Sequence, residues 1–122
     1  MTAAIAALQG LTIFERGWLS SNNVLVHGNG AGASLIDTSH SLHAAQTVAL
    51  VRHALQQSAP RESLVRIVNT HLHSDHCGGN AAIQQHWACP ISVPVGQFEA
   101  ARHWREEDLR SEEHTSELQS PC

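Results

Sequence analysis

The residues with the most chemical potential in this chain lie between positions 71 and 76. Three imidazoles and one carboxylate occur there, at His71, His73, Asp75 and His76. Neutral imidazole nitrogens and carboxylate oxygens are the ligands that a borderline cation such as zinc prefers. His71 and His73 are two residues apart and would point to opposite faces of a straight strand. We therefore expect the chain to leave the strand and bend there, so that both can face one metal ion.

Asp75 and His76 can then reach a second cation beside the first. Two cations about 3.5–4 Å apart can share a water and convert it to hydroxide near neutral pH. A purely structural origin of the run is disfavoured, because it follows an apolar segment and precedes Gly78-Gly79. We assign no role to the other histidines of residues 1–109, which are scattered: His27, His40, His43, His53, His86 and His103.

Strands and helices alternate along the chain, which is typical of an α/β layer architecture. The run 64–68 is mostly apolar and is expected to be a buried strand, so the 71–76 run lies just beyond its carboxyl end. A hairpin turn is expected at 28–30. The other expected strands are 11–15, 24–27, 33–37 and 90–93, and the other expected helices are 81–87 and 97–109.

One longer helix is expected from Ser41, which can cap it, to about residue 57. Its apolar stripe comprises Ala44, Val48, Val51 and Leu55, which would pack on a sheet.

The run 71–76 resembles the His-x-His-x-Asp-His signature of the metallo-β-lactamase-fold hydrolases. The preceding strand, Gly78-Gly79-Asn80 and the segments 23–28 and 34–38 resemble the corresponding parts of that family. The second of these segments ends in Asp37-Thr38 and then continues with Ser39, where the family usually has glycine. The resemblance covers roughly residues 11–105.

The resemblance implies the N-terminal half of an αβ/βα sandwich and a zinc-dependent hydrolase with two zinc ions in the complete protein. His71 and His73 would bind the first ion, and Asp75 and His76 the second. A metal-bound hydroxide would attack a small-molecule ester, thioester, lactone, β-lactam or phosphoester, and Asp75 would orient it and accept or relay its proton. A further histidine, a bridging aspartate and a last histidine would follow downstream, and the chain offers no candidate for them. We therefore expect an incomplete and inactive fragment.

Two alternatives stay open on the same residues. The first is a mononuclear iron oxidoreductase of the persulfide dioxygenase kind, which shares the fold. The second is a metal-binding module without turnover. Metal content and oxygen consumption would separate them from a hydrolase.

The end of the chain differs in character from the rest. Residues 110–122 resemble the translation of a short-read sequencing adapter joined in frame to a gene. The competing interpretation is an ordinary acidic, solvated tail. We expect residues 1–109 to be the N-terminal part of a metallo-β-lactamase-like domain and 110–122 to be non-native.

Composition narrows the class of protein further. The formal net charge is −4 and all seven basic residues are arginines without a basic stripe, which argues against a nucleic-acid partner. An apolar content of 42% is enough for a globular core, and no run approaches the roughly 20 apolar residues of a membrane span. The start lacks a positively charged region, so we expect a cytoplasmic protein rather than an exported one.

Three further side chains have more than one interpretation. Asp37 would either support the motif loop or a ligand histidine, or cap the following helix, and we prefer these roles to direct metal ligation. Cys77 is expected to pack behind the loop rather than bind metal, and three cysteines do not make a disulfide framework. Trp18 either lines a substrate cleft or belongs to the core.

Overall fold

The computed structural model describes residues 4–8, 10–17, 22–58 and 60–97. Six strands form one sheet in the order β1-β2-β3-β4-β5-β6. The strands are β1 (Ala4–Leu8), β2 (Leu11–Glu15), β3 (Asn23–Val26), β4 (Ala33–Ile36), β5 (Leu64–Val68) and β6 (Ile91–Ser92). Pairing is antiparallel from β1 to β4 and parallel from β4 to β6. This is the α/β class that the alternation of elements predicted.

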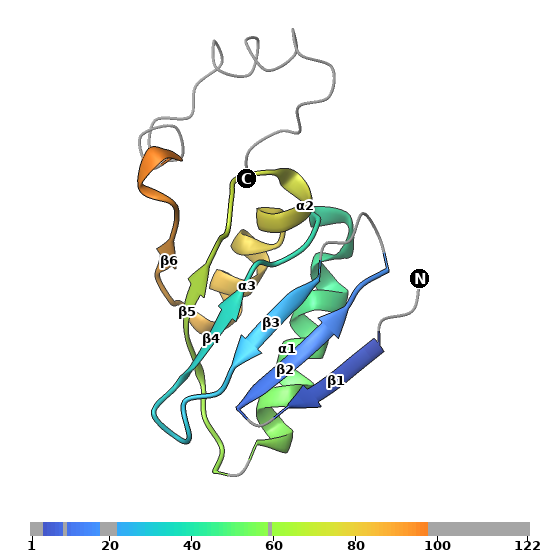
Figure 1. Cartoon of the computed structure of the whole chain (residues 1–122), viewed down its shortest axis with the longest axis vertical. Coiled ribbons are helices and arrows are strands. Elements are labelled where there is room, and N and C mark those ends of the chain that lie inside the picture. The colour runs from blue at the N-terminus through green and yellow to red at the C-terminus, as the bar shows by residue number, and fades with distance from the viewer. Residues whose placement is uncertain (1–3, 9, 18–21, 59, 98–122) are drawn as a thin grey trace, which may run out of the picture.

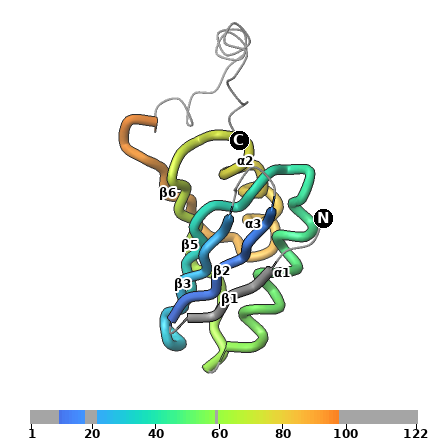
Figure 2. The backbone as a smooth tube through the Cα atoms, turned by 45° about the vertical axis from the view of Figure 1, so that its right-hand side comes forward, coloured from blue at the N-terminus to red at the C-terminus, as the bar shows by residue number. Residues whose placement is uncertain are grey.

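The helices lie on one side of this sheet, as Figures 1 and 2 show for α1 and α3. They are the 3-10 helix η1 (Ser41–His43), α1 (Ala44–Gln57), α2 (Ser74–Cys77), α3 (Asn80–Trp87) and the 3-10 helix η2 (Val95–Gln97). None of the helices in the described ranges is long and apolar enough to cross a membrane. The predicted helix 97–109 lies outside the described residues, apart from Gln97, which ends η2.

The core fills the space between α1, α3 and one face of the sheet. Alternate residues of β2, β3 and β4 supply it, since successive side chains of a strand point to opposite faces, and β5 adds Leu64 and Ile67 across an irregularity in its register with β4. Its fully buried members are Phe14, Leu25, Ala33, Leu35, Val51, Ile67 and Ile83. Of the predicted α1 stripe, Val48, Val51 and Leu55 are buried, and Ala44 is half-buried.

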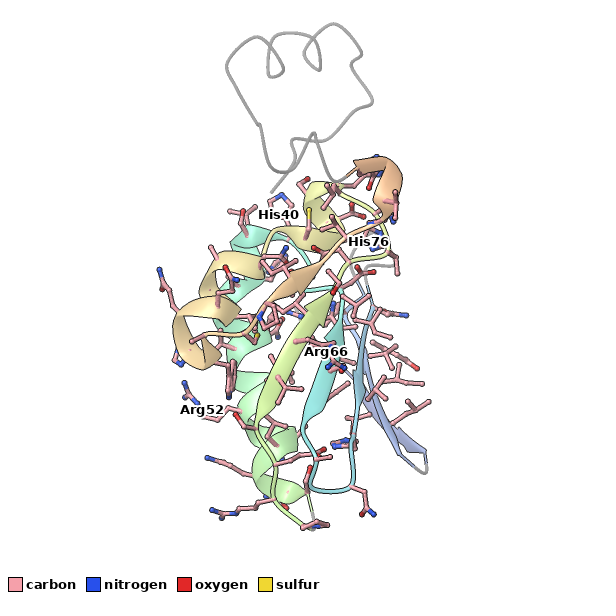
Figure 3. The ribbon with its side chains drawn as sticks, turned by 90° about the vertical axis from the view of Figure 1, so that its left-hand side faces the viewer. His40, Arg52, Arg66 and His76 are labelled. Carbon is pink, nitrogen blue, oxygen red and sulfur yellow. The ribbon has the colours of Figure 1, made fainter. Side chains whose placement is uncertain are left out.

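The other face of the sheet has no helix on it in the described part of the chain (Figure 3). The prediction that 64–68 is a buried strand is therefore half wrong. Leu64 and Ile67 are buried, but Val65 is 36% exposed and Arg66 is also exposed, because no second layer of the described residues covers them. Apolar side chains of the neighbouring strands, such as Val24 and Ile36, are only half-buried on that face.

Two local features differ from the expectations. The segment Ala4–Leu8 forms strand β1, although no strand is expected there. Ser41 is not the cap: His40 precedes η1 and its Nδ1 accepts a hydrogen bond from the Leu42 amide at 3.0 Å. The imidazole reaches that amide because His40 is still extended, whereas Ser41 already has helical backbone.

The hairpin prediction at 28–30 is confirmed. The Ala31 amide donates to the Gly28 carbonyl at 3.0 Å, and Asn29 and Gly30 both have positive φ values of 53° and 92°. Two successive positive φ values define the hairpin turn that matches the twist of the flanking strands.

The strand directions place the candidate site residues at one end of the strands. Since β2, β4 and β5 run in the same direction, their carboxyl ends meet at the end of the sheet where α2 lies (Figure 1). The segments that follow β4 and β5, residues 37–40 and 69–73, therefore face each other. The Asp37 amide donates to the Val68 carbonyl at 2.8 Å and fixes their relative position.

Candidate metal centre

The three histidines of the 71–76 run converge, as their residue types and spacing predicted. The chain leaves β5 after Val68, and His71 and His73 lie in irregular backbone before α2 begins at Ser74. The His71 ring centroid lies 4.7 Å from that of His73 and 4.0 Å from that of His76. The bend thus brings together side chains that a straight strand would separate.

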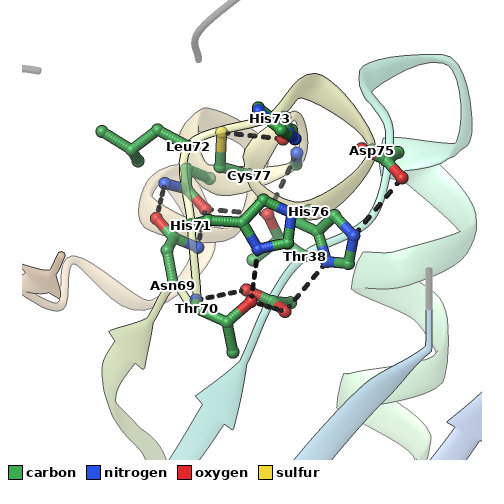
Figure 4. Close-up of polar contacts among 12 residues, drawn as sticks. Thr38, Asn69, Thr70, His71, Leu72, His73, Asp75, His76 and Cys77 are labelled. Carbon is green, nitrogen blue, oxygen red and sulfur yellow. Dashed lines mark hydrogen bonds and ion pairs between the residues drawn. The ribbon is translucent and has the colours of Figure 1, made fainter. Parts of the chain in front are cut away.

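Asp75 and His76 bring two atoms that can ligate a metal close to each other (Figure 4). Asp75 Oδ2 lies 3.3 Å from His76 Nε2, and the Asp75 side chain is largely buried. Two ligands of one tetrahedral zinc, each about 2.0–2.1 Å from the ion, lie roughly 3.3 Å apart. The contact is an ion pair when His76 is protonated, and its spacing also matches that of two ligands of a single cation.

The described residues do not complete a site. No group of three or more histidine, cysteine, aspartate or glutamate side chains among them is placed to hold an ion together. The assignment of His71, His73, Asp75 and His76 as metal ligands therefore stays a prediction, and so does the catalytic role of Asp75.

Asp37 supports the motif loop from the end of β4. Its carboxylate is buried, with the residue 4% exposed, and accepts three hydrogen bonds. The Thr70 amide donates to Oδ1 at 2.8 Å, the Thr70 hydroxyl donates to Oδ2 at 2.7 Å, and His76 Nδ1 donates to Oδ2 at 3.1 Å. Of the roles weighed for Asp37, support of the motif loop is confirmed; its carboxylate also contacts His76, whose role as a metal ligand stays a prediction.

These bonds fix which nitrogen of two imidazoles carries the proton. A carboxylate only accepts, so the hydrogen between His76 Nδ1 and Asp37 belongs to the imidazole. Nε2, which faces the Asp75 carboxylate at 3.3 Å, carries a second hydrogen in the imidazolium and the lone pair in the neutral form. The Thr70 hydroxyl gives its only proton to Asp37, so it must accept from His71 Nδ1, which lies 3.0 Å away. His71 Nε2 is then also the nitrogen left for a metal.

The electrostatics of the cluster also favour a neutral His71. Burial lowers the pKa of His71, and the neighbouring His76 and His73 lower it further. The carboxylates of Asp37 and Asp75 act in the opposite direction but do not outweigh these effects. A metal ligand must present an unprotonated nitrogen, so this shift extends the pH range in which His71 can bind a cation.

A buried polar network lies beneath the motif. Thr38 Oγ1 donates to Asn80 Oδ1 at 2.7 Å, and Asn80 Nδ2 donates to Asn69 Oδ1 at 2.7 Å. The Thr38 amide also donates to the His76 carbonyl at 2.8 Å. Gly79 is required here by proximity, since a Cβ on it would collide with the Thr38 carbonyl oxygen.

Gln97 holds the motif loop from the other side. Its Oε1 accepts the Leu72 amide at 2.9 Å, between the two histidines of the His-x-His pair. Sequence analysis missed Gln97, Thr38, Asn69 and Thr70 as site residues. Only the last two carry a local signal, because they continue the strand directly into His71.

The remaining predicted residues divide into two groups. Cys77 is fully buried behind the loop, as expected, with Sγ 3.1 Å from the His73 carbonyl oxygen. Trp18, His103 and the tail 110–122 lie outside the described residues, so the predictions about them stay untested.

In this chain, one sheet carries helices on one face and a His-x-His-x-Asp-His loop at the carboxyl ends of its parallel strands. A family model described as the metallo-beta-lactamase superfamily matches residues 16–117. The chain belongs to this superfamily. The match overlaps the first part of the predicted tail, and the boundary at residue 109 stays a prediction. Among curated proteins no significant match is found.

Solved structures support the fold. A metallo-beta-lactamase of Cronobacter sakazakii with a HARLDQ motif aligns with a TM-score of 0.63 and 24% identity, over 83% of this chain and 37% of that one. MEM-A1, a subclass B3 enzyme from a soil metagenome library, aligns with a TM-score of 0.59 and 21% identity, over 98% and 40%. A further B3 metallo-beta-lactamase, described as the first with an active-site glutamic acid, aligns with a TM-score of 0.54 and 25% identity, over 82% of this chain and 32% of that one. The chain therefore spans well under half the length of these proteins.

Proposed function

We propose that this chain supplies one part of the active site of a zinc-dependent hydrolase that acts on a small molecule. The observation that carries the proposal is the Asp75–His76 pair, with Oδ2 and Nε2 3.3 Å apart and Nδ1 of the same imidazole held by Asp37. In this proposal His71 and His73 bind a first ion, and Asp75 and His76 bind a second.

The residues of the chain would prepare and orient the reactants. Bound divalent cations lower the pKa of a coordinated water and polarise the electrophilic carbon or phosphorus of a substrate. Asp75 would orient the attacking water and accept or relay its proton. Asp37 and Thr70 would keep the Nε2 atoms of His76 and His71 unprotonated and directed into the site.

The proposed substrates share an electrophilic carbonyl or phosphoryl centre, as in β-lactams, thioesters, lactones and phosphoesters. A β-lactam is the first to test, because the structural neighbours are named as metallo-beta-lactamases and one of them reaches 25% identity. We do not expect nucleic acid as a partner, because the formal net charge is negative and the sequence has no basic stripe. A cytoplasmic location stays a prediction.

The ligand count sets what the isolated chain should do. Two protein ligands per ion are fewer than the three that catalytic zinc usually has. We therefore expect the 122-residue chain to bind zinc weakly and to turn over little. The apolar sheet face that no described helix covers should also make it poorly soluble.

The test begins with the source gene. Its reading frame would be sequenced past the codon for Leu109, and the uninterrupted product would be expressed, analysed for metal and assayed on the four substrate types. We expect zinc in the product and hydrolysis of at least one type, reduced about a hundredfold or more in Asp75→Asn. The exposed-histidine variant His53→Ala serves as the matched control and should keep wild-type activity.

Three other results would contradict the proposal. Oxygen consumption by an iron-loaded product with no hydrolysis would favour the dioxygenase alternative. Bound metal without any turnover would favour a metal-binding module. A native reading frame that ends with residues 110–122 would leave a half-domain, and the enzyme assignment would then be withdrawn.

A further inference from the structure

A fully buried arginine lies at the same edge of the sheet as the candidate metal centre. Arg16 directly follows β2, has an exposed fraction of 0% and is the largest fully buried side chain of the described residues. Because β2 and β4 run in the same direction, Arg16 and Asp37 both follow strands that end at this edge. Charged side chains are almost never fully buried unless they are paired.

The partners of Arg16 are uncharged. Nη1 donates to Asn23 Oδ1 at 2.8 Å and to Thr47 Oγ1 at 2.6 Å. Nη2 donates to Gln46 Oε1 at 2.7 Å, whereas Nε is buried without a hydrogen-bond partner. Within the described ranges no carboxylate forms an ion pair with this guanidinium. Burial lowers the pKa of Arg16, which expresses the same cost of removing the cation from water.

Stability alone does not explain such a residue, because a buried charge among neutral groups costs free energy. Its contacts instead join three elements: the end of β2, the start of β3 and the first turn of α1. Arg16 therefore fixes where α1 begins relative to the sheet edge.

Thr47 connects Arg16 to Thr38, in the segment that follows β4 and faces the motif loop. The Thr47 hydroxyl lies 3.3 Å from the Thr38 carbonyl oxygen and 3.1 Å from that of His43. Thr38 is flanked by Asp37 and Ser39, which both adopt left-handed backbone with φ values of 62° and 67°. Non-glycine residues in this conformation are strained and persist only where their surroundings hold them.

We infer that Arg16 is a positioning residue of the candidate metal centre. Through Thr47 it holds Thr38 between its left-handed neighbours Asp37 and Ser39, and so keeps the Asp37 carboxylate on Nδ1 of His76. The inference rests on the proposed function for its consequence in metal binding, but the position of Asp37 can be measured without metal.

The first test follows the His76 imidazole by nitrogen NMR in the metal-free 122-residue chain with labelled histidine. At a pH high enough for the His76 imidazole to be neutral, wild type should show His76 as a single tautomer with the proton on Nδ1. In Thr47→Val and Arg16→Met, we expect exchange between tautomers or loss of the Nδ1 proton signal. Thr47→Ser keeps the hydroxyl and should restore the wild-type spectrum, which a merely space-filling role of the side chain would not predict.

A matched control separates position from stability. Leu64→Ala removes a buried side chain at the opposite end of β5, where the residue is 2% exposed, and should leave the His76 signal unchanged. The inference is wrong if Thr47→Val and Arg16→Met are folded and keep the wild-type His76 spectrum. It is also wrong if Leu64→Ala changes that spectrum equally. Should Arg16→Met not fold, the two Thr47 variants decide.

Zinc titration of the same variants tests the consequence. Supporting residues around a metal ligand typically change affinity by about 10–100-fold, and we expect a loss in that range for Arg16→Met and Thr47→Val. A changed His76 spectrum in a chain that never binds metal would contradict the proposed function and leave the positioning role intact. Unchanged spectra with normal metal binding would overturn only the positioning role.

Discussion

Asp37 Oδ2 lies 3.1 Å from Nδ1 of His76, although 39 positions separate the two residues in the sequence. The contact exists because β4 and β5 are parallel neighbours and deliver the segments after them to the same edge of the sheet. A buried carboxylate on one imidazole nitrogen leaves the other nitrogen for a cation. The fold thus prepares His76 before any metal arrives.

Replacement of this carboxylate should weaken metal binding more than folding. Asp37→Asn keeps the size of the side chain and tolerates the left-handed backbone, since asparagine adopts it readily. The amide can still accept from Thr70 but no longer carries the charge that orients His76. We expect zinc affinity to fall about 10–100-fold, as measured by competition with a chelator dye.

Urea unfolding midpoints of the variant and wild type are the control. The fall in zinc affinity should be seen under conditions in which these midpoints show both proteins to be fully folded. Equal zinc affinity of Asp37→Asn and wild type would contradict the assigned role of Asp37.

Ser39 offers a gain in stability. Its φ of 67° costs an L-residue about 1–2 kcal/mol, and glycine avoids most of that cost while losing up to about 1 kcal/mol through a more flexible unfolded chain. Ser39→Gly should therefore raise the free energy of unfolding by about 1 kcal/mol or less. Ala88→Gly, at the left-handed residue that ends α3, is the matched control and should gain a similar amount.

Urea denaturation measures both variants. A loss of stability in Ser39→Gly together with a gain in Ala88→Gly would mean that the Ser39 side chain contributes more than its backbone strain costs.

The elements and the metal motif could be predicted because their signals are local. The apolar run 64–68, the glycines after Cys77 and the spacing of His71, His73 and His76 are all readable within a few residues. The stripe of α1 follows from helical periodicity alone. Strand β1 escaped prediction because it is short and rich in alanine, a residue with little preference for strands.

The support of the site could not be predicted in the same way. Arg16 meets Thr47, and Gln97 meets Leu72, only after the strands have paired, so no spacing in the sequence announces these contacts. The exposure of Val65 has a similar origin. A run of apolar residues predicts a strand, but only the number of layers around it decides whether both faces are buried.

Glu62 lies at the end of the sheet opposite the motif, and it should make the free energy of unfolding depend on pH. Its side chain is 1% exposed and accepts hydrogen bonds from the Gly28 and Gly30 amides and a contact from His27 Nδ1 at 3.1 Å. Burial alone would raise the pKa of Glu62, but the bonds from Gly30, Gly28, His27 and Gly32 outweigh it and lower the pKa. The folded state thus binds this proton more weakly than the unfolded state.

The sign of the effect follows from this difference. Stabilisation by Glu62 is fully present above the ordinary glutamate pKa and is lost as the pH falls through that value toward the lower folded one. Glu62→Gln should unfold about 1–2 kcal/mol more easily at pH 7, and the gap to wild type should narrow in acid. Denaturant midpoints from pH 3 to pH 7 measure this difference in stability between Glu62→Gln and wild type. A difference that is constant over that range would contradict the assigned role of Glu62.

Gln97 should order the His-x-His pair. Gln97→Met keeps a similar length but removes the acceptor of the Leu72 amide, so hydrogen exchange at Leu72 should accelerate about tenfold or more. Gln84→Met is the matched control, since Gln84 donates to the Cys89 carbonyl at 2.8 Å, outside the motif loop. Exchange at Leu72 that is equally fast in the Gln84 variant, or unchanged in the Gln97 variant, would exclude a specific role of Gln97.

The most direct measurement of the central claim is a zinc titration by calorimetry on five forms of the chain: wild type, His71→Ala, His73→Ala, His76→Ala and His86→Ala. His86 is an exposed histidine beside Arg52 and Trp87, remote in sequence from the motif. We predict that each of the three motif variants binds zinc at least about tenfold more weakly than wild type, while His86→Ala binds as wild type does. Wild-type affinity in the motif variants, or an equal loss in His86→Ala, would contradict the assignment of the 71–76 run as a metal centre.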